Sequence, residues 1–387
     1  MHADELQREA RALLAMVANN SCSLAEDTLT LEADVYRDQA RYAQEQQALF
    51  RRYPQFVGPS CLLPEAGDTF AFDDAGVPII VMRRSDGSLG AFVNICAHRG
   101  APLGDGLGRA HGGHLLRCPY HGWSYDEHGS LAGVPQAKLG FPDLDRSRHG
   151  LVSLPVSEQD GCIFVAATPG SQLDAADVLG GLGQALAGFG LDNHHLLGRK
   201  RVETAINWKL NMDTFHEFYH FAALHPESIA TMSHSNICHY RQYGRNHCMS
   251  SPTLQIDELL SRDEASWSPR SYLSLVIYLF PNTVIFIVED HFPTWQVYPT
   301  AIDRSVVYHS MYLPRPPADE KERVEREAFF RMINDVAVNE DYRLVERLQR
   351  GLDAGIDHQL VIGRNEPGVQ NMHRQIEQLL NEEVSPG

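Results

Sequence analysis

The sequence predicts an α+β protein whose N-terminal half contains an all-β segment. Residues 54–167 consist of short β-rich runs separated by Gly and Pro, whereas residues 4–52 and 318–351 show the apolar spacing of amphipathic helices. A chain of 387 residues is long enough for two domains. We expect three parts: a helical segment over residues 1–54 that packs on the second domain, a β domain over 55–167 and a second domain over 168–387.

The expected elements alternate between helical and extended stretches. After the first helical stretch, the clearest strand candidates are residues 77–82, 91–95 and 162–165. The second half is expected to contain helices over 171–193, a strand leading into a helix over 197–210, strands over 272–312, and helices over 318–351 and 369–380.

Charge and composition exclude several classes of protein. The net charge is −17, from 33 basic and 50 acidic residues, which disfavours binding to nucleic acid or to an anionic membrane. The most apolar stretch, residues 272–288, is interrupted by Pro281, Asn282 and Thr283 and therefore suits two buried strands joined by a turn. Seven cysteines and an acidic N-terminus without an apolar core favour a reducing, cytoplasmic location.

Two short sequences each supply one Cys and one His. Cys96 and His98 lie in CAHRG (residues 96–100), and Cys118 and His121 lie in CPYHGW, with 19 residues between the two pairs. Four such ligands can hold a structural zinc ion in a Cys₂His₂ site. Alternatively, the two thiolates hold one iron of a [2Fe–2S] cluster and the two imidazoles hold the other.

These two sequences resemble the signature of the Rieske non-haem iron oxygenases, and the resemblance extends over most of residues 55–165. It implies a Rieske [2Fe–2S] cluster bound by Cys96, His98, Cys118 and His121. His111 and His114 lie between the two loops and off the motif positions, so we expect them to be solvated loop residues.

A second group of histidines begins with HEFYH at residues 216–220, which is literally an HExxH zinc-protease motif. The motif needs a third ligand. The extension found in one protease class requires Gly and His where this chain has Ala223 and Pro226, and no Glu occurs between Glu227 and Glu258. The sequence therefore disfavours a zinc protease.

The alternative pairs His220 with His225. On an ideal helix, five residues turn through about 140°, so these two imidazoles converge only if the helix ends between them. Pro226 favours such an end, because the residue before a proline avoids the α conformation. Two His and one carboxylate on one face of an iron leave positions open for O₂ and substrate.

Residues 207–225 align without gaps to the mononuclear-iron motif of the same oxygenases. The resemblance implies that His220 and His225 are iron ligands and that His216 is a polar neighbour. The acidic residue that links the two metal centres is usually Asp; here it is Glu217, which is similar to the branch containing alkylammonium oxygenases. At three residues before His220, a Glu can accept the N–H of that ligand and fix its tautomer.

The third iron ligand is expected far along the chain. The segment around Asp341 resembles the C-terminal helix of the family, in which an acidic residue precedes a stretch similar to Gln-x-Gly-Leu. Asp341 is therefore the expected ligand, with Glu340 and Asp335 as rivals.

The resemblance also implies architecture and partners. It implies a catalytic domain with an antiparallel sheet flanked by helices (helix-grip, START-like). It further implies a homotrimer in which electrons pass from His121 of one subunit through Glu217 to His220 of the next. The glycine run at 181–185 does not fit a dinucleotide site, so a separate NAD(P)H-dependent reductase, possibly with a ferredoxin, is expected.

The expected function is that of a terminal oxygenase component. It uses O₂ to monohydroxylate or oxidatively dealkylate a small organic substrate. A cis-dihydroxylating arene dioxygenase is the alternative, and an electron carrier without oxygenase activity is a remote one. Six aromatic residues of the 272–295 region are candidates for an apolar pocket, although most are expected to be sheet core: Tyr272, Tyr278, Phe280, Phe286, Phe292 and Trp295.

Overall fold

The structure is a computed structural model that describes residues 1–357 and 359–384. The chain divides into two compact units, described separately below. One unit contains Met1–Glu45, Leu179–Gly190 and His194–Gly387, and the other contains Gln46–Val178 and Leu191–Asn193. Among the described residues, no helix is long and apolar enough to cross a membrane.

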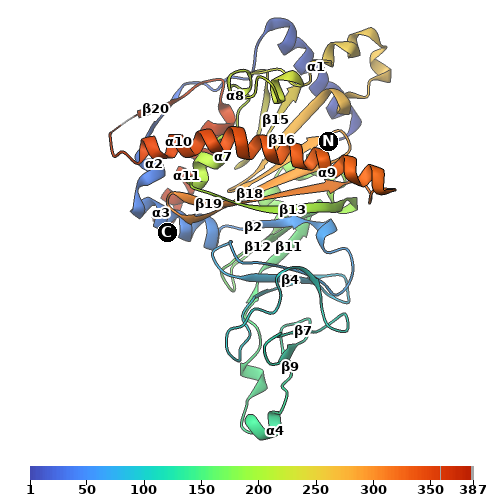
Figure 1. Cartoon of the computed structure of the whole chain (residues 1–387), viewed down its shortest axis with the longest axis vertical. Helices are drawn as coiled ribbons and strands as arrows, with labels where there is room; N and C mark the ends of the chain where they lie inside the picture. Colours follow the sequence, from blue (N-terminus) through green and yellow to red (C-terminus); the bar gives the residue numbers. More distant parts are fainter. Residues whose placement is uncertain (358, 385–387) are drawn as a thin grey trace. The chain divides into compact units, whose positions relative to one another are not determined.

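The unit around Gln46–Val178 is built from three antiparallel sheets (Figure 1). The larger sheet has the order β10-β5-β4-β3-β6, and the two smaller ones have the orders β11-β12-β2 and β7-β8-β9. Within this unit, β7, β9 and α4 lie at one end and β2, β11 and β12 at the other (Figure 1). The elements are a π-helical segment (Gln46–Arg52), β2 (Gln55–Pro59), β3 (Asp68–Phe72), β4 (Ile79–Arg83), β5 (Leu89–Val93), β6 (Gly106–Arg109), β7 (Leu116–Arg117), β8 (Ser124–Tyr125), β9 (Leu131–Gly133), α4 (Ala137–Gly140), β10 (Ser153–Leu154), β11 (Val156–Gln159), β12 (Cys162–Val165) and α5 (Ala175–Leu179).

The other unit is organised around a seven-stranded antiparallel sheet with the order β13-β19-β18-β17-β16-β15-β14. Alternation places every second residue on one face, so Val276 of β16, its cross-strand partner Phe286 of β17, and Val284 of β17 with its partner Trp295 of β18 share a face. The strands are β13 (His195–Thr204), β14 (His239–Tyr243), β15 (Asn246–Pro252), β16 (Leu273–Leu279), β17 (Thr283–Val288), β18 (Phe292–Ala301) and β19 (Arg304–Leu313).

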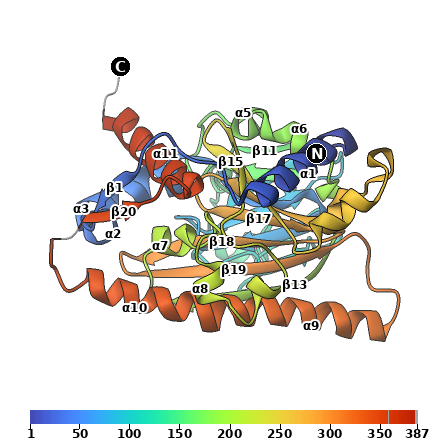
Figure 2. The ribbon, with the colours of Figure 1, turned by 90° about the horizontal axis from the view of Figure 1, so that it is seen from above.

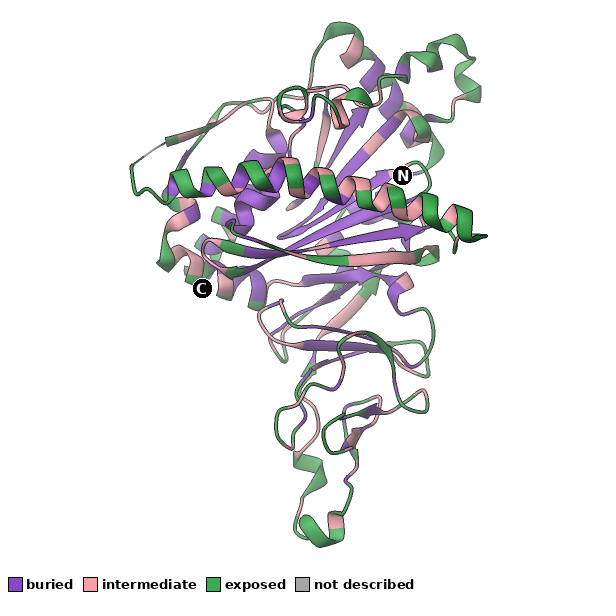
Figure 3. Cartoon of the chain, viewed as in Figure 1, coloured by how far each residue is buried: buried purple, intermediate pink, exposed green. Residues whose placement is uncertain are grey.

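One long helical rod accompanies this sheet. It consists of α9 (Glu320–Val336), a π-helical turn (Ala337–Tyr342) and α10 (Arg343–Leu352), which run on as one rod in Figure 2. The strands of the sheet are largely buried, whereas the outward side of α9 and α10 is exposed (Figure 3). The other elements of the unit are α1 (Ala3–Asn19), β1 (Leu29–Glu32), α2 (Asp34–Arg37), α3 (Gln39–Glu45), α6 (Leu182–Ala187), α7 (Trp208–Asp213), α8 (Phe221–Leu224), β20 (Gln359–Ile362) and α11 (Pro367–Val384).

The expected α+β class with an antiparallel sheet flanked by helices is confirmed. The strand predicted at 162–165 has those bounds, and the turn at Pro281 and Asn282 separates β16 from β17. Three features differ from expectation: β14 and β15 were not predicted, β1 pairs with the distant β20, and the predicted 318–351 helix contains a π-helical turn. Pairing between distant segments has no local signal, and a single π-helical turn within a long helix is too short to alter the overall helical pattern that the sequence shows.

Candidate metal centres

The two Cys/His loops fold in the same way. In each, the glycine four residues after the cysteine donates its N–H to the cysteine carbonyl, with N···O distances of 2.9 Å for Gly100 to Cys96 and 3.0 Å for Gly122 to Cys118. Both glycines have positive φ, 77° and 73°. An L side chain rarely adopts this conformation, so each loop requires Gly at this position. The repeated turn presents one thiol and one imidazole from each loop.

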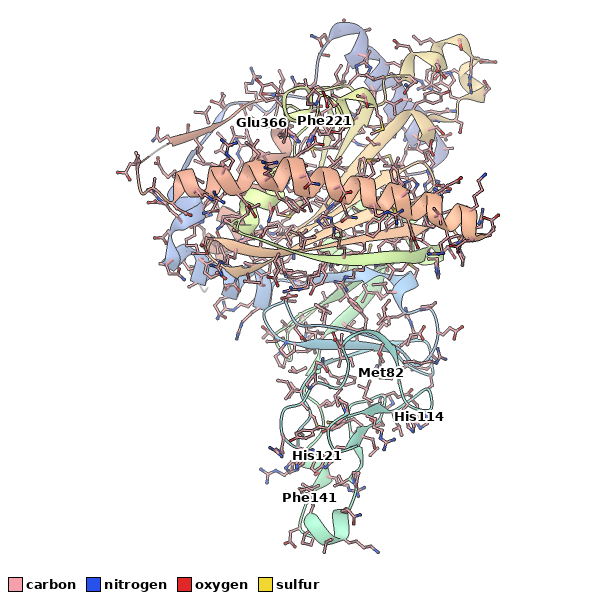
Figure 4. The ribbon with its side chains drawn as sticks, viewed as in Figure 1. Met82, His114, His121, Phe141, Phe221 and Glu366 are labelled. Carbon is pink, nitrogen blue, oxygen red and sulfur yellow. The ribbon has the colours of Figure 1, made fainter. Side chains whose placement is uncertain are left out.

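The two thiols lie in one buried cluster with Trp123, and the two imidazoles lie beside each other. Cys96 and Cys118 are buried, and the ring centroids of His98 and His121 lie 4.7 Å apart. His98 stacks on Trp123 at 4.8 Å and meets the edge of Phe141 at 5.5 Å. His121 and Phe141 are labelled in Figure 4. His111 and His114 are exposed, as predicted.

The donor set suits an iron–sulfur cluster. Burial raises the pKa of the Cys96 thiol, and the hydroxyl of Tyr125, 3.2 Å from Cys96 Sγ, opposes that rise. A coordinated metal ion deprotonates its thiol ligands outright. Nδ1 of His98 is buried and has no hydrogen-bond partner, which is the condition expected of a nitrogen reserved for a metal. Two thiols with two imidazoles match the ligand set of a Rieske cluster.

The second group of histidines lies in the other unit, where the chain is not the single helix that the HEFYH spacing suggests. The helix α7 ends at Asp213, residues 214–220 are irregular, and α8 covers only Phe221–Leu224. His225 lies beyond α8 with φ −115° and ψ 40°, outside the helical region, as expected before Pro226. His216 is fully buried and is not grouped with His220, so the two do not form the pair that a zinc protease requires.

The histidines His220 and His225 meet Asp341 from the π-helical turn. Oδ1 of Asp341 lies 3.1 Å from Nε2 of His225 and 3.5 Å from Nε2 of His220. One ligand atom from each residue lies within 4.8 Å of the others, the only such group of three or more among the described residues. A two-histidine, one-carboxylate set of this kind suits a non-haem iron with open coordination positions.

In both imidazoles, the Nδ1 atom, which is the ring nitrogen that does not face Asp341, contacts a carboxylate. Nδ1 of His225 lies 2.7 Å from Oε2 of Glu340, which also accepts a hydrogen bond from Ser228 Oγ at 2.9 Å. Nδ1 of His220 contacts Oε1 of Glu217 in the same way. Each contact fixes the tautomer that leaves Nε2 free to face Asp341. The rivals for the third ligand thus differ: Glu340 contacts the outer nitrogen of His225, and Asp335 is exposed and outside the group.

The electrostatics agree with this arrangement. Burial lowers the pKa of His225, but the hydrogen bonds that its ring donates to the carboxylates of Asp341 and Glu340 outweigh burial, and the net pKa is raised. Burial also raises the pKa of Glu366, labelled in Figure 4, and the carboxylates of Glu217 and Asp213 add to that rise. The surroundings of the two histidines are therefore anionic, which favours a bound cation.

A cavity of about 280 Å³ opens onto this group and is lined by His220, His225 and Asp341. Residues on one face of the sheet line it, namely Ser274, Val276, Val284, Phe286, Val288 and Trp295. Residues at helical spacing on α9 and the π-helical turn line another side, namely Phe329, Met332, Ile333, Val336 and Ala337. The cavity therefore lies between the sheet and the long helical rod.

Part of this lining was predicted from the sequence. Of the six aromatic candidates, Phe286 and Trp295 line the cavity; the other four do not, in agreement with the expectation that most are core. The contributions of Phe215, Phe329 and Arg270 were missed. Phe329 could have been found, because residues 329, 333 and 337 are spaced four apart and therefore lie on the same helix face as Asp341.

Both halves of the chain match known protein families. Two protein-family models match it: the Rieske [2Fe-2S] domain over residues 54–145, and the ring hydroxylating alpha subunit catalytic domain over residues 191–382. Together they account for most of the sequence.

Similar characterised proteins are oxygenase subunits. The chain is 28% identical over 364 residues to the glycine betaine monooxygenase oxygenase subunit of Chromohalobacter salexigens, covering 84% of this chain and 80% of that protein. It is 26% identical to the carnitine monooxygenase oxygenase subunit of Escherichia coli K12, covering 87% and 88%. It is 34% identical to the anthranilate 1,2-dioxygenase large subunit of Burkholderia cepacia, but over only 49% of this chain and 46% of that one.

Solved structures show the same fold. The quaternary ammonium Rieske monooxygenase in complex with L-carnitine has a TM-score of 0.76 at 22% identity, covering 90% of this chain and 95% of that chain. Naphthalene 1,2-dioxygenase with bound indole has a TM-score of 0.70 at 17% identity, covering 92% and 93%.

The fold and the two donor sets define an iron-dependent oxidoreductase with a cluster domain and a catalytic domain. The chain belongs to the Rieske oxygenases, as an oxygenase component of the ring-hydroxylating alpha-subunit type. Its cofactors are accordingly a Rieske [2Fe–2S] cluster and a mononuclear iron, as predicted. The expected class of a terminal oxygenase acting on a small organic substrate is confirmed.

Proposed function

We propose that this oxygenase inserts one oxygen atom into a small alkylammonium substrate, by hydroxylation or by oxidative dealkylation. The observation that supports it is the aromatic lining of the cavity beside His220 and His225. The ring of Trp295 lies 5.2 Å from that of Phe215 and 6.2 Å from that of Phe286, and all three line the cavity. Such faces attract a quaternary ammonium group, the substrate class named for the glycine betaine and carnitine relatives.

The iron ligands proposed are His220, His225 and Asp341, and the cluster ligands are Cys96, His98, Cys118 and His121. An iron bound by two histidines and one carboxylate supplies O₂ activation, and the cluster supplies electrons one at a time. The chain's own residues orient the ligands: Glu340 and Glu217 hold the outer nitrogens of His225 and His220. The apolar side chains around the cavity exclude water from the substrate. On this assignment, residues 55–167 form the cluster domain, 168–387 the catalytic domain, and 1–54 a helical segment packed on the latter.

Electrons reach the catalytic site through a neighbouring subunit in this proposal. The active assembly is a homotrimer, or a multiple of it, in which His121 of one subunit approaches Glu217 of the next. The contact between Glu217 and His220 Nδ1 supports the last step of that path. One related structure is described as giving insight into inter-subunit electron transfer. A separate NAD(P)H-dependent reductase, with or without a ferredoxin, supplies the electrons, and the cytoplasm is the compartment proposed, with no nucleic-acid or membrane partner.

The test is a product screen with a surrogate reductase over quaternary amines, aromatic acids and aryl ethers. We expect O₂ uptake coupled to NADH oxidation with a quaternary amine, and a product that contains one atom from ¹⁸O₂. Turnover of arenes to cis-diols, with quaternary amines inert, would contradict the proposal. It would favour the second candidate, a cis-dihydroxylating dioxygenase, for which the anthranilate dioxygenase relative is the supporting observation.

A further inference from the structure

One cationic side chain in the cavity lining has no counter-ion within the part of the chain that the structure describes. Arg270, in the 3₁₀ turn Pro269–Tyr272 just before β16, lines the same cavity as His220, His225 and Asp341. Its Nε is buried and has no hydrogen-bond partner. Among the described residues, its guanidinium forms no hydrogen bond or ion pair. It lies over the ring of Phe189, whose centroid is 5.1 Å from the guanidinium carbon.

The nearby acidic groups do not pair with Arg270. Asp290 acts on it electrostatically, but its carboxylate is already bound by Arg326 at 3.2 Å and by His291 at 3.0 Å. Glu289 also lines the cavity, but it forms no ion pair with Arg270. Burial removes part of the hydration of the Arg270 guanidinium and lowers its pKa.

A half-buried guanidinium without a partner is unfavourable, because the lost hydration is not replaced by hydrogen bonds. The guanidinium stays charged in proteins and offers a planar set of donors that fits a carboxylate. A cavity lined mainly by apolar side chains strengthens such a pairing. An anionic group of the substrate would therefore supply the hydrogen bonds and the negative charge that the Arg270 guanidinium lacks.

A second donor without a partner lies at the same end of the sheet. Thr253 lines the cavity, and its buried Oγ1 has no hydrogen-bond partner. Its backbone N–H donates to the carbonyl of Tyr272 at 2.9 Å, which ties it to the turn that contains Arg270. The indole Nε1 of Trp295 is a third buried donor of the lining without a partner.

We propose that Arg270, assisted by the hydroxyl of Thr253, binds a carboxylate group of the substrate, so that the enzyme selects substrates with an anionic end. The inference concerns the same cavity as the proposed function and rests on it for the reactive end of the substrate. Together the two describe a zwitterionic substrate whose ammonium group contacts the aromatic rings and whose carboxylate contacts Arg270.

Calorimetric titration of the iron-loaded, full-length oxygenase tests this binding without turnover. The ligands are matched pairs of a carboxylate and its primary amide. One pair is the zwitterion (trimethylammonio)acetate with 2-(trimethylammonio)acetamide, and the other is benzoate with benzamide. Arg270→Met keeps an unbranched aliphatic side chain but removes the guanidinium that lies over Phe189. Thr253→Val keeps the shape but removes the hydroxyl. Glu289→Gln removes an anion from the same cavity lining and serves as the matched control.

We expect wild type to prefer the carboxylate of at least one pair. Arg270→Met should weaken that carboxylate about 10- to 100-fold and leave its amide unchanged, as for a charge-assisted hydrogen bond. Thr253→Val should weaken it about 3- to 10-fold, and Glu289→Gln should not weaken it. The proposal would be overturned if wild type showed no preference for a carboxylate over its amide. It would also be overturned if Arg270→Met weakened the binding of both members of a pair equally, or of neither.

The ligand pairs separate this inference from the proposed function. If benzoate shows the Arg270-dependent preference and the trimethylammonium pair does not bind, the alkylammonium proposal fails and the carboxylate site stands. If both trimethylammonium ligands bind equally well and do not respond to Arg270→Met, while benzoate shows no preference over benzamide, the carboxylate site fails and the alkylammonium proposal stands.

Discussion

The Nδ1 atom of His225 lies 2.7 Å from Oε2 of Glu340, while its Nε2 atom lies 3.1 Å from Oδ1 of the next residue, Asp341. Two consecutive acidic residues thus reach opposite sides of one imidazole. Both belong to the π-helical turn Ala337–Tyr342, and turns of this kind occur frequently at functional sites. The arrangement predicts different roles for the two carboxylates.

Removing the carboxylate of Asp341 should remove the mononuclear iron. A [2Fe–2S] cluster plus one iron gives about three irons per chain, and Asp341→Ala should retain about two because the cluster ligands are unchanged. Glu340→Gln should keep the iron but bind it about 10- to 100-fold more weakly, since only an outer hydrogen bond changes. Iron quantitation after dialysis against a chelator measures both. Full iron in Asp341→Ala, or its loss in the exposed Asp335→Asn control, would show that the third ligand is misassigned.

Replacing Glu217 should break electron delivery without loss of either metal. Glu217 contacts Nδ1 of His220 and accepts its backbone N–H at 3.1 Å. We expect Glu217→Gln to retain iron and the cluster spectrum but to lose about 100-fold in turnover. Reoxidation of the reduced cluster by O₂ in the presence of substrate, followed by absorbance, should slow in parallel. Glu217→Asp restores a carboxylate and should recover part of the rate; normal turnover in Glu217→Gln would contradict the proposed path, and Glu227→Gln is the exposed control.

Tyr125 should tune the reduction potential of the cluster. Its hydroxyl lies 3.2 Å from Sγ of Cys96 and accepts the N–H of Ala97 at 2.9 Å. A hydrogen bond to a ligand sulfur stabilises the more negative, reduced cluster. Tyr125→Phe removes a bond of about 1 kcal/mol, which corresponds to about 40 mV for one electron, so the potential should fall by that order. Spectroelectrochemical titration of the variant measures the change, and an unchanged or higher potential would show that the hydroxyl does not act on the cluster.

The sequence contained most of the local information about both sites. Short-range patterns predicted the Cys/His loops, because Gly100 and Gly122 adopt a conformation that other residues rarely tolerate. Pro226 predicted that His225 leaves the helix, since a proline restricts the residue before it. Each of these predictions depended on a few neighbouring residues.

The remainder depended on contacts between distant segments. Only the resemblance to the family favoured Asp341 over Glu340, because both are acidic residues of one helical segment. The structure shows that Glu340 reaches Nδ1 of His225 and that Asp341, 116 residues after His225 in the chain, reaches Nε2. Arg270 likewise resembled any basic residue near a strand, and only its burial without a partner distinguishes it. Whether a buried polar group has a hydrogen-bond partner depends on how distant segments pack, and local sequence patterns do not contain this information.

His309 should make the catalytic domain sensitive to acid. Burial lowers its pKa to about 3, with its Nδ1 hydrogen-bonded to Asn334 at 2.5 Å and its Nε2 to Tyr342 at 2.8 Å. Below pH 6.5 the unfolded chain binds a proton that the folded chain does not, so stability is full above about pH 6.5 and is lost as the pH falls towards 3. His309→Gln should reduce the loss between pH 7.5 and 5 by about 2 kcal/mol. Urea unfolding at both pH values measures it; an unchanged loss would contradict the assignment.

The buried ion pair between Glu45 and Lys209 should be required for stable folding of the unit that contains the iron site. Nζ of Lys209 lies 2.6 Å from Oε2 of Glu45, which also accepts the indole N–H of Trp208 at 3.0 Å, and both charged side chains are almost completely buried. Burial lowers the pKa of Lys209, and the carboxylate of Glu45 opposes that shift. Glu45→Ala leaves the ammonium group unpaired and should lower the free energy of unfolding by about 3–5 kcal/mol. The double variant Glu45→Leu/Lys209→Met removes both charges and should lie closer to wild type, because the cost arises from the unpaired charge. Urea midpoints of the three proteins measure the difference; a double variant less stable than Glu45→Ala would show that packing, and not charge pairing, sets the contribution of this site.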